Sequence, residues 1–162
     1  MRRFGIEAGW LIFCVGLLPA VTTAAVSCSV SATGPVFGVY NPLSATPTYA
    51  NGQIQATCTL LSGGATTVTL VSSYSSGKSG SYAMRTMLSG TNKLNYNLFF
   101  DAAYTQIRGD GTGGSQTGGA SLALSPGNPT QSSTSTIYGR IPASQDVAAG
   151  AYSDTIVVTI TY

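Results

Sequence analysis

The sequence predicts an all-β protein, folded as one antiparallel β-sandwich. Twenty Gly and seven Pro lie among many Thr, Val and Tyr, a composition typical of short strands joined by turns. Several short stretches alternate apolar and polar residues with a period of two, and beyond the N-terminus no stretch combines helical spacing with caps. The length of 162 residues corresponds to one domain.

The N-terminal residues are typical of a secretory signal peptide, which we place at residues 1–25. A pair of arginines is followed by the apolar stretch GWLIFCVGLLPAV and then by the small residues TTAAVS, with Ala24 or Ala25 as the last residue of the leader. The apolar stretch is short for a membrane span, and an N-terminal anchor is the alternative. We therefore expect the domain to occupy residues 26–162, Cys14 to leave with the leader, and no stable membrane span to remain.

The chain is poor in charge, with 7% Asp, Glu, Lys and Arg, and it contains no His. Without the leader, five basic and four acidic residues remain, and 5 − 4 gives a net charge of +1. Electrostatic binding to nucleic acid needs clustered Lys and Arg, so we expect no nucleic-acid partner. The absence of His and the scattered Asp residues also argue against a metal site, a cofactor and acid–base catalysis, so we do not expect an enzyme.

Two cysteines, Cys28 and Cys58, remain after removal of the leader. In an exported protein such a pair indicates one disulfide, and two free thiols are the alternative. A loop of this length would stabilise the fold by roughly 3–4 kcal/mol in the chain-entropy description.

Five stretches ahead of the C-terminal segment are predicted strands. The first surrounds Cys28, and the second, GQIQATCTL, places Cys58 on its apolar face, toward the core. The stretch KLNYNLFFD places Asn95 and Asn97 on its outer face, and on its other face it places Leu94, Tyr96, Leu98 and Phe100. The predicted strands cover residues 26–32, 52–60, 66–71, 93–101 and 135–142, and turn-rich segments cover 41–52, 72–81, 109–119 and 125–133.

The C-terminal segment, from Tyr152 to the end, has the cleanest alternation in the chain. Ile156, Val158, Ile160 and Tyr162 point one way, and polar residues alternate with them on most of the other face. The segment contains no Pro, Lys or Arg that would protect an exposed strand edge from pairing with another chain. The sequence therefore predicts an apolar edge strand, and a central strand paired on both sides is the alternative.

Two glycine-rich stretches match nucleotide-binding patterns without the structural context that those patterns need. The stretch GDGTGG at residues 109–114 fits G-x-G-x-x-G, yet no helix is expected after it. The stretch SSGKS resembles a phosphate loop, but Ser72 stands where its first glycine is required. Ser75 and Lys78 form an S-x-x-K pair whose companion motifs are absent. We interpret both stretches as polar loops.

Several further stretches together resemble one family. They are FGVY after the first mature cysteine, ATCT at the second, MRTMLSG, LNYNLFFDAAYT and IYGRIPASQDVAAGAYSDTIVVTITY. In this order they are similar to the spore coat protein U domain family, which includes the pilin subunits of archaic chaperone–usher pili. The resemblance spans nearly the whole mature chain, from Cys28 to Tyr162.

The resemblance implies a secreted, non-catalytic structural subunit of a surface pilus or coat, with an immunoglobulin-like sandwich that lacks one strand. A periplasmic chaperone would fill the gap first, and a strand from another pilin or coat subunit would replace it at the outer-membrane usher. The groove that accepts the strand would then be walled by Ile156, Val158, Ile160 and Tyr162. We expect the mature protein to pass through the periplasm to the cell surface.

The chain departs from the pilin pattern at its N-terminus. Cleavage after Ala24 or Ala25 leaves only two or three residues before Cys28, fewer than the five or six of an ordinary strand. We therefore expect a subunit that accepts a strand but has little capacity to donate one.

Two other functions are consistent with the sequence. The protein could be an adhesin that binds a sugar or an abiotic surface through its loops, with Tyr74, Tyr82 and Tyr104 forming an aromatic platform. Tyrosines that pack within the loops or the core are the alternative, which we favour for these three residues. It could also be a self-contained secreted domain whose groove is closed from within.

Overall fold

The computed structural model describes residues 23–162, and over these residues the chain is all-β, as the sequence predicts. Eight strands and one short 3-10 helix, η1 (Gly77–Ser79), follow one another along the chain. The expected signal peptide lies almost entirely outside the described residues and stays a prediction. Within residues 23–162 the structure has no helix long and apolar enough to cross a membrane.

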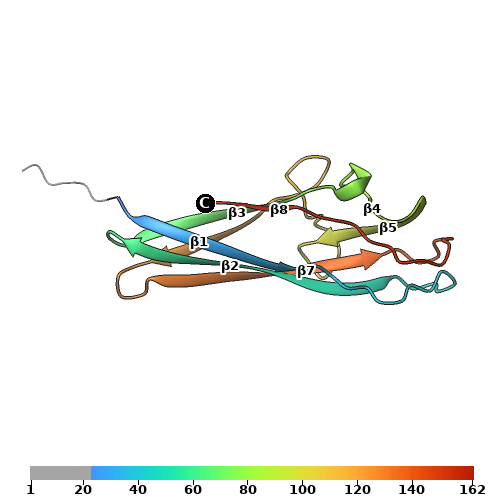
Figure 1. Ribbon diagram of the computed structural model, residues 1–162, viewed down its shortest axis with the longest axis horizontal. Coiled ribbons are helices and arrows are strands. Elements are labelled where there is room, and N and C mark those ends of the chain that lie inside the picture. Colours follow the sequence, from blue (N-terminus) through green and yellow to red (C-terminus); the bar gives the residue numbers. More distant parts are fainter. Residues whose placement is uncertain (1–22) are drawn as a thin grey trace, which may run out of the picture.

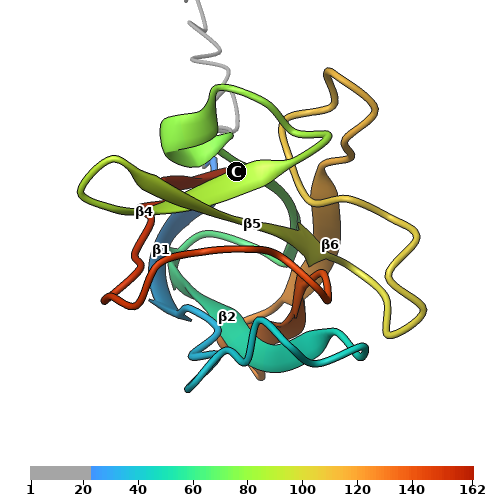
Figure 2. The same cartoon turned by 90° about the vertical axis from the view of Figure 1, so that its right-hand side faces the viewer.

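Two antiparallel sheets form a sandwich, and the view along its long axis shows them curving around a common interior (Figures 1 and 2). The larger sheet has five strands in the order β1-β2-β7-β5-β4, and the smaller has three in the order β6-β3-β8. The predicted fold class is confirmed. The strands are β1 (Ala25–Thr33), β2 (Thr48–Ser62), β3 (Thr66–Tyr74), β4 (Arg85–Ser89), β5 (Asn92–Phe99), β6 (Gly118–Leu124), β7 (Thr130–Ile141) and β8 (Val158–Thr161).

Two clusters of buried side chains fill the interior, and both arise from the period-two alternation of the strands. The first lies around the disulfide and consists of Ala56, Cys58, Leu60, Val68, Leu70, Leu122 and Leu124. The second, here called the groove cluster, consists of Ile54, Tyr74, Met87, Leu94, Tyr96, Leu98, Ile137 and Ile141.

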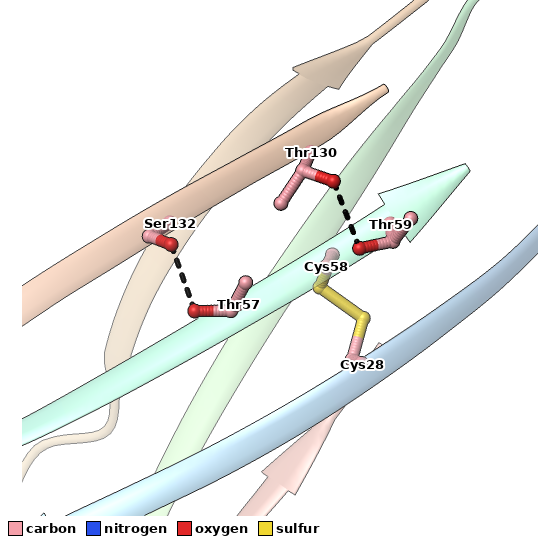
Figure 3. The surroundings of a disulfide bond; sticks show 6 residues. All are labelled: Cys28, Thr57, Cys58, Thr59, Thr130 and Ser132. Atoms are coloured by element: carbon pink, nitrogen blue, oxygen red, sulfur yellow. Dashed lines mark hydrogen bonds between the residues drawn. A yellow bond between two sulfur atoms is a disulfide. The ribbon is translucent and has the colours of Figure 1, made fainter. Parts of the chain in front are cut away.

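The predicted disulfide is present. Strands β1 and β2 pair with Cys28 directly opposite Cys58, and the two sulfur atoms are bonded (Figure 3). The side chain of Cys58 is fully buried, as its place on the apolar face predicted, whereas Cys28 is half-buried. The bond therefore fastens the edge strand β1 to the interior of the sandwich.

The first half of β7 has no apolar face, and the predicted start of this strand is wrong. A turn-rich segment was predicted up to residue 133, but β7 begins at Thr130. Its hydroxyl groups pair with those of β2: Thr57 Oγ1 lies 2.7 Å from Ser132 Oγ, and Thr59 Oγ1 lies 3.1 Å from Thr130 Oγ1 (Figure 3). Cross-strand hydroxyl pairs of this kind stabilise a polar strand without burial.

Three other predicted breaks are shorter than expected. Strand β3 continues to Tyr74, inside the expected segment 72–81. Strand β2 begins at Thr48, inside the expected segment 41–52, and β6 begins at Gly118, where a loop was expected. A Cβ atom at Gly118 would lie 2.5 Å from the hydroxyl of Ser72 and 2.8 Å from the ring of Phe100. The glycine is therefore needed for a close approach within the fold, and it does not mark a flexible loop.

The C-terminal segment is less regular than predicted. Only Val158–Thr161 forms a strand, although exposure still alternates from residue to residue between 151 and 160. Ahead of β8, Ser153 forms an isolated bridge with Leu88 of β4. Within the described part of the chain β8 pairs with β3 alone, so it is an edge strand and not a central one.

Candidate functional site

A cavity of about 1100 Å³, here called the groove, lies between the two sheets. Protein interiors are normally packed without voids much larger than a water molecule. A cavity of this size instead reaches the upper end of the range for ligand-binding clefts. Its apolar lining includes seven members of the groove cluster: Tyr74, Met87, Leu94, Tyr96, Leu98, Ile137 and Ile141.

The C-terminal segment forms one wall of the groove. The side chains of Ile156 and Val158 line it, and Ile160 packs against both interior clusters. All three are only half-buried, because nothing within residues 23–162 covers their remaining surface. Tyr162, which was predicted to share this face, is 61% exposed and does not line the groove.

The backbone of the C-terminal segment presents an open edge beside the groove. The amide of Ser75 donates to the carbonyl of Val157 at 2.9 Å, and the register with β3 continues from there. Hydrogen-bonded residues alternate along an antiparallel pair, so Val157, Thr159 and Thr161 face β3. The backbone groups of Val158 and Ile160 therefore point away from β3, and no strand among the described residues pairs with them.

The opposite border of the groove is formed by the end of β1 and by the segment that follows it. Strand β1 is one edge strand of the larger sheet, and β8 is one edge strand of the smaller sheet. Figure 2 shows both strands on the same side of the sandwich. Phe37 lines the groove and packs edge-to-face on Tyr96, with ring centroids 6.1 Å apart. Its ring lies so close to Gly139 that a Cβ there would approach within 2.7 Å, so β7 needs glycine at this position.

Asp154 anchors the C-terminal segment just ahead of Ile156 and β8. One carboxylate oxygen accepts hydrogen bonds from the amides of Lys78 (3.0 Å) and Thr155 (2.8 Å), and the other accepts one from the hydroxyl of Tyr96 (2.8 Å). A Cβ at Gly77 would collide with this carboxylate, so the turn at η1 requires glycine. Asp154 is the only charged side chain between Tyr152 and Tyr162, and its role is therefore structural.

Two fully buried arginines, Arg85 and Arg108, form hydrogen bonds that stabilise the surrounding loops. The sequence analysis did not identify them as functional or structural residues. The guanidinium of Arg85 donates to the side chain of Asn97 and to the carbonyls of Ser75 and Arg108. Asn97 lies opposite Arg140, on the face turned away from the groove, as the alternation predicted. It is nevertheless buried there, because its amide donates to the carbonyl of Tyr82 and the residue is 7% exposed. Burial lowers the pKa of Arg85 below its ordinary value.

Arg108 ties three strands together. Its guanidinium donates to the carbonyl of Phe99 in β5, to the hydroxyl of Tyr74 in β3 and to the hydroxyl of Ser135 in β7, and it also donates to the carbonyl of Thr136. Burial lowers the pKa of this guanidinium as well. Every hydrogen-bond partner of this guanidinium is a carbonyl or a hydroxyl group. No oppositely charged residue in the sequence therefore indicates these contacts.

The three tyrosines considered as an aromatic platform do not come together. Tyr74 is 1% exposed and belongs to the groove cluster. Tyr82 lies over the guanidinium of Arg85, with 5.2 Å between the ring centroid and Cζ. Tyr104 lies elsewhere, beside Tyr49. That set of three is therefore not a surface site, although Tyr104 has partners that the sequence did not reveal.

Comparison with known proteins shows which family the sequence matches. Residues 14–159 match the family described as Spore Coat Protein U domain. The chain is 30% identical over 133 residues to Protein U of Myxococcus xanthus, an alignment that covers 78% of this chain and 70% of that protein.

Among solved structures, the chain is similar to a protein chain in the complex of the chaperone CsuC with the tip adhesion subunit CsuE. That complex comes from the archaic chaperone–usher Csu pili of Acinetobacter baumannii. The sequences are 20% identical and the TM-score is 0.49, and the match covers 85% of this chain and 40% of the other.

Proposed function

The chain belongs to the spore coat protein U domain family, and from this premise we propose that it is a non-catalytic structural subunit of a surface pilus or spore-coat-like assembly. Its groove accepts a β-strand from another molecule. One observation carries the proposal: a large apolar groove lies directly beside an unpaired strand edge. The incomplete immunoglobulin-like sandwich that the family resemblance implies has these two features.

An inserted strand would satisfy both features at once. Its backbone would pair with the free backbone groups of Val158 and Ile160, and alternate side chains would fill the groove. A typical strand of five or six residues is about 17–20 Å long, enough to follow the C-terminal segment past Ile156. Each large apolar side chain transferred from water into the groove would stabilise the complex by roughly 1.5–3 kcal/mol before the entropic cost of ordering the strand.

The partners follow from the exposed edge. An unpaired apolar edge aggregates with other chains, so we infer that a periplasmic chaperone holds the groove filled until an outer-membrane usher joins the subunit to its neighbours. The Cys28–Cys58 disulfide supports export through an oxidising compartment to the cell surface.

We propose that this subunit accepts a strand more readily than it donates one. Ala25, Val26 and Ser27 already belong to β1, where they pair with β2 of the same chain. A donor segment would therefore have to precede Ala25. If the leader is removed after Ala24 or Ala25, as the sequence predicts, no such segment remains, and the purified protein forms no long fibres by strand exchange. N-terminal sequencing of the mature protein tests the premise, and long fibres from the unmodified mature chain contradict the conclusion.

Truncation of the C-terminal segment tests the accepting role. A chain that ends at Ile156 lacks Val158 and Ile160, and we expect it to lose co-purification with the chaperone. A chain that lacks only the exposed Tyr162 is the matched control and should retain full capture. Equal capture of both truncated chains at wild-type yield would refute the role of the groove wall.

A further inference from the structure

Four aromatic rings and one guanidinium gather on the face of the larger sheet that is turned away from the groove. Tyr138 and Arg140 of β7 alternate with residues that line the groove, so they lie on the outer face. Tyr49 of β2 is directly opposite Arg140 in the strand register. Tyr104, from the loop after β5, lies over Tyr49 with ring centroids 4.7 Å apart. We call this set the outer platform: Tyr49, Phe99, Tyr104, Tyr138 and Arg140.

The central ring of the outer platform is held in one position. Tyr104 has a φ of +58°, in the left-handed region that large side chains rarely adopt. Its amide donates to the carbonyl of Asp101, and the Asp101 carboxylate accepts the amides of Thr105 and Gln106. The hydrogen bond from Gln106 is the main reason why the pKa of Asp101 lies below its ordinary value. Phe99 supports the ring from beneath, edge-to-face at 5.5 Å. A rigid, partly exposed aromatic ring loses little entropy on binding.

Arg140 differs from the two buried arginines because no described residue uses its hydrogen-bonding capacity. Its Cζ lies 5.2 Å from the ring centroid of Phe99 and 5.6 Å from that of Tyr104. Within residues 23–162 its guanidinium makes no hydrogen bond and no ion pair, whereas those of Arg85 and Arg108 are engaged by carbonyls and polar side chains. A half-buried guanidinium on an aromatic surface presents planar N–H donors that match a carboxylate.

A second, smaller cavity adjoins this guanidinium. Its volume is about 230 Å³, and Arg140, Tyr104 and Phe99 line it together with Met84 and Ile107. This is below the range for a whole drug-sized ligand. The cavity therefore suits a group no larger than about one substituted ring.

We propose that the outer platform binds carboxylate-bearing sugars of an acidic polysaccharide. The apolar face of a pyranose ring stacks on Tyr104 and Tyr49, and its carboxylate accepts hydrogen bonds from Arg140. The platform and the groove lie on opposite faces of the sheet, so this inference does not depend on strand acceptance. A strand that fills the groove therefore does not cover the platform.

The test is calorimetric titration of the secreted mature protein with oligogalacturonate at low salt. We expect the wild-type protein to bind, and Arg140→Gln to weaken binding by about tenfold or more, because a charge-assisted hydrogen bond is lost. Tyr49→Ala should weaken it by a similar factor through loss of stacking. Lys93→Gln removes one exposed positive charge outside the platform and is the matched control, with an expected change of less than about twofold at this salt concentration.

A methyl-esterified oligogalacturonate separates recognition of the carboxylate from general stacking. It should bind the wild-type protein about as weakly as the acid form binds Arg140→Gln, and that substitution should not weaken it further. The proposal is overturned if the wild-type protein does not bind the acid form, or if Lys93→Gln and Arg140→Gln weaken binding equally. Equal affinity for the acid and the ester would also overturn it. Self-association that Tyr49→Ala abolishes, without any sugar binding, would assign the platform to subunit contacts instead.

Discussion

The hydroxyl of Tyr96 donates a 2.8 Å hydrogen bond to Asp154, and this contact ties the larger sheet to the C-terminal segment within the lining of the groove. Burial, together with this hydrogen bond, raises the pKa of Tyr96, so the phenol remains a neutral donor at physiological pH. The second carboxylate oxygen holds the amide of Lys78. Asp154 thus fixes the position from which the wall of the groove extends.

Replacing Asp154 should release this wall. Asp154→Ala removes the acceptors of three hydrogen bonds. With a synthetic donor-strand peptide bound in the groove of both proteins, we expect the free energy of unfolding to fall by about 1–3 kcal/mol relative to wild type. Asp154→Asn keeps one carbonyl oxygen for the amide of Lys78 and should cost less. The measurement is urea unfolding followed by far-ultraviolet circular dichroism.

Asp146→Ala is the control, because Asp146 is exposed and makes no hydrogen bond within the described residues. Its effect should stay within about 0.5 kcal/mol. If Asp154→Ala were as mild as Asp146→Ala, the anchoring role of Asp154 would be wrong.

Arg108→Lys should be strongly destabilising although it conserves the charge. A single ammonium group cannot reach acceptors on β3, β5 and β7 together, so buried carbonyls and hydroxyls would lose their donors. We expect a loss of about 2–4 kcal/mol in the free energy of unfolding. Arg140→Lys is the same substitution at a half-buried guanidinium that makes no hydrogen bond to the described part of the chain, and it should cost less than about 1 kcal/mol. Comparable losses for the two variants would contradict the proposed role of Arg108.

The two cysteines should respond differently to replacement by serine. Both variants lose the crosslink, worth roughly 3–4 kcal/mol for a sequence separation of 30 residues. Cys58→Ser also places a hydroxyl in an apolar cluster and should cost about 1–3 kcal/mol more than Cys28→Ser. Cys58→Ala should recover most of that difference. Equal unfolding free energies for Cys58→Ser and Cys58→Ala would show that the site is not apolar.

Alternation in the sequence was sufficient to predict the fold class and the inner faces of several strands. It placed Cys58 in the interior and Ile156 and Val158 on one face, because a period of two fixes the side of a strand on which a residue lies. It failed for β6 and for the start of β7, where glycine and hydroxyl residues form strands through close approach and cross-strand hydroxyl pairs.

The buried polar contacts and the outer platform could not be predicted in the same way. Arginine is usually exposed, so the sequence gives no reason to expect Arg85 and Arg108 in the interior. Their hydrogen-bond acceptors are mostly backbone carbonyls, which only the folded chain brings near them. Tyr104 meets Tyr49 and Arg140 only because a loop folds back over two strands that are distant in sequence. Pairings of this kind depend on the register of the sheets, and local pattern carries no information about them.

Amide hydrogen exchange at the C-terminal segment tests most directly the central claim, that the groove accepts a strand along its open edge. The amides of Val158 and Ile160 point away from β3, whereas those of Thr159 and Thr161 point toward it. In the mature protein without a partner, Val158 and Ile160 should exchange rapidly and Thr159 and Thr161 more slowly. When a peptide copied from the N-terminal extension of a partner subunit is added, Val158 and Ile160 should become protected, while Thr159 and Thr161 change less. Protection of Val158 and Ile160 before the peptide is added, or no change after it has bound, would contradict the account.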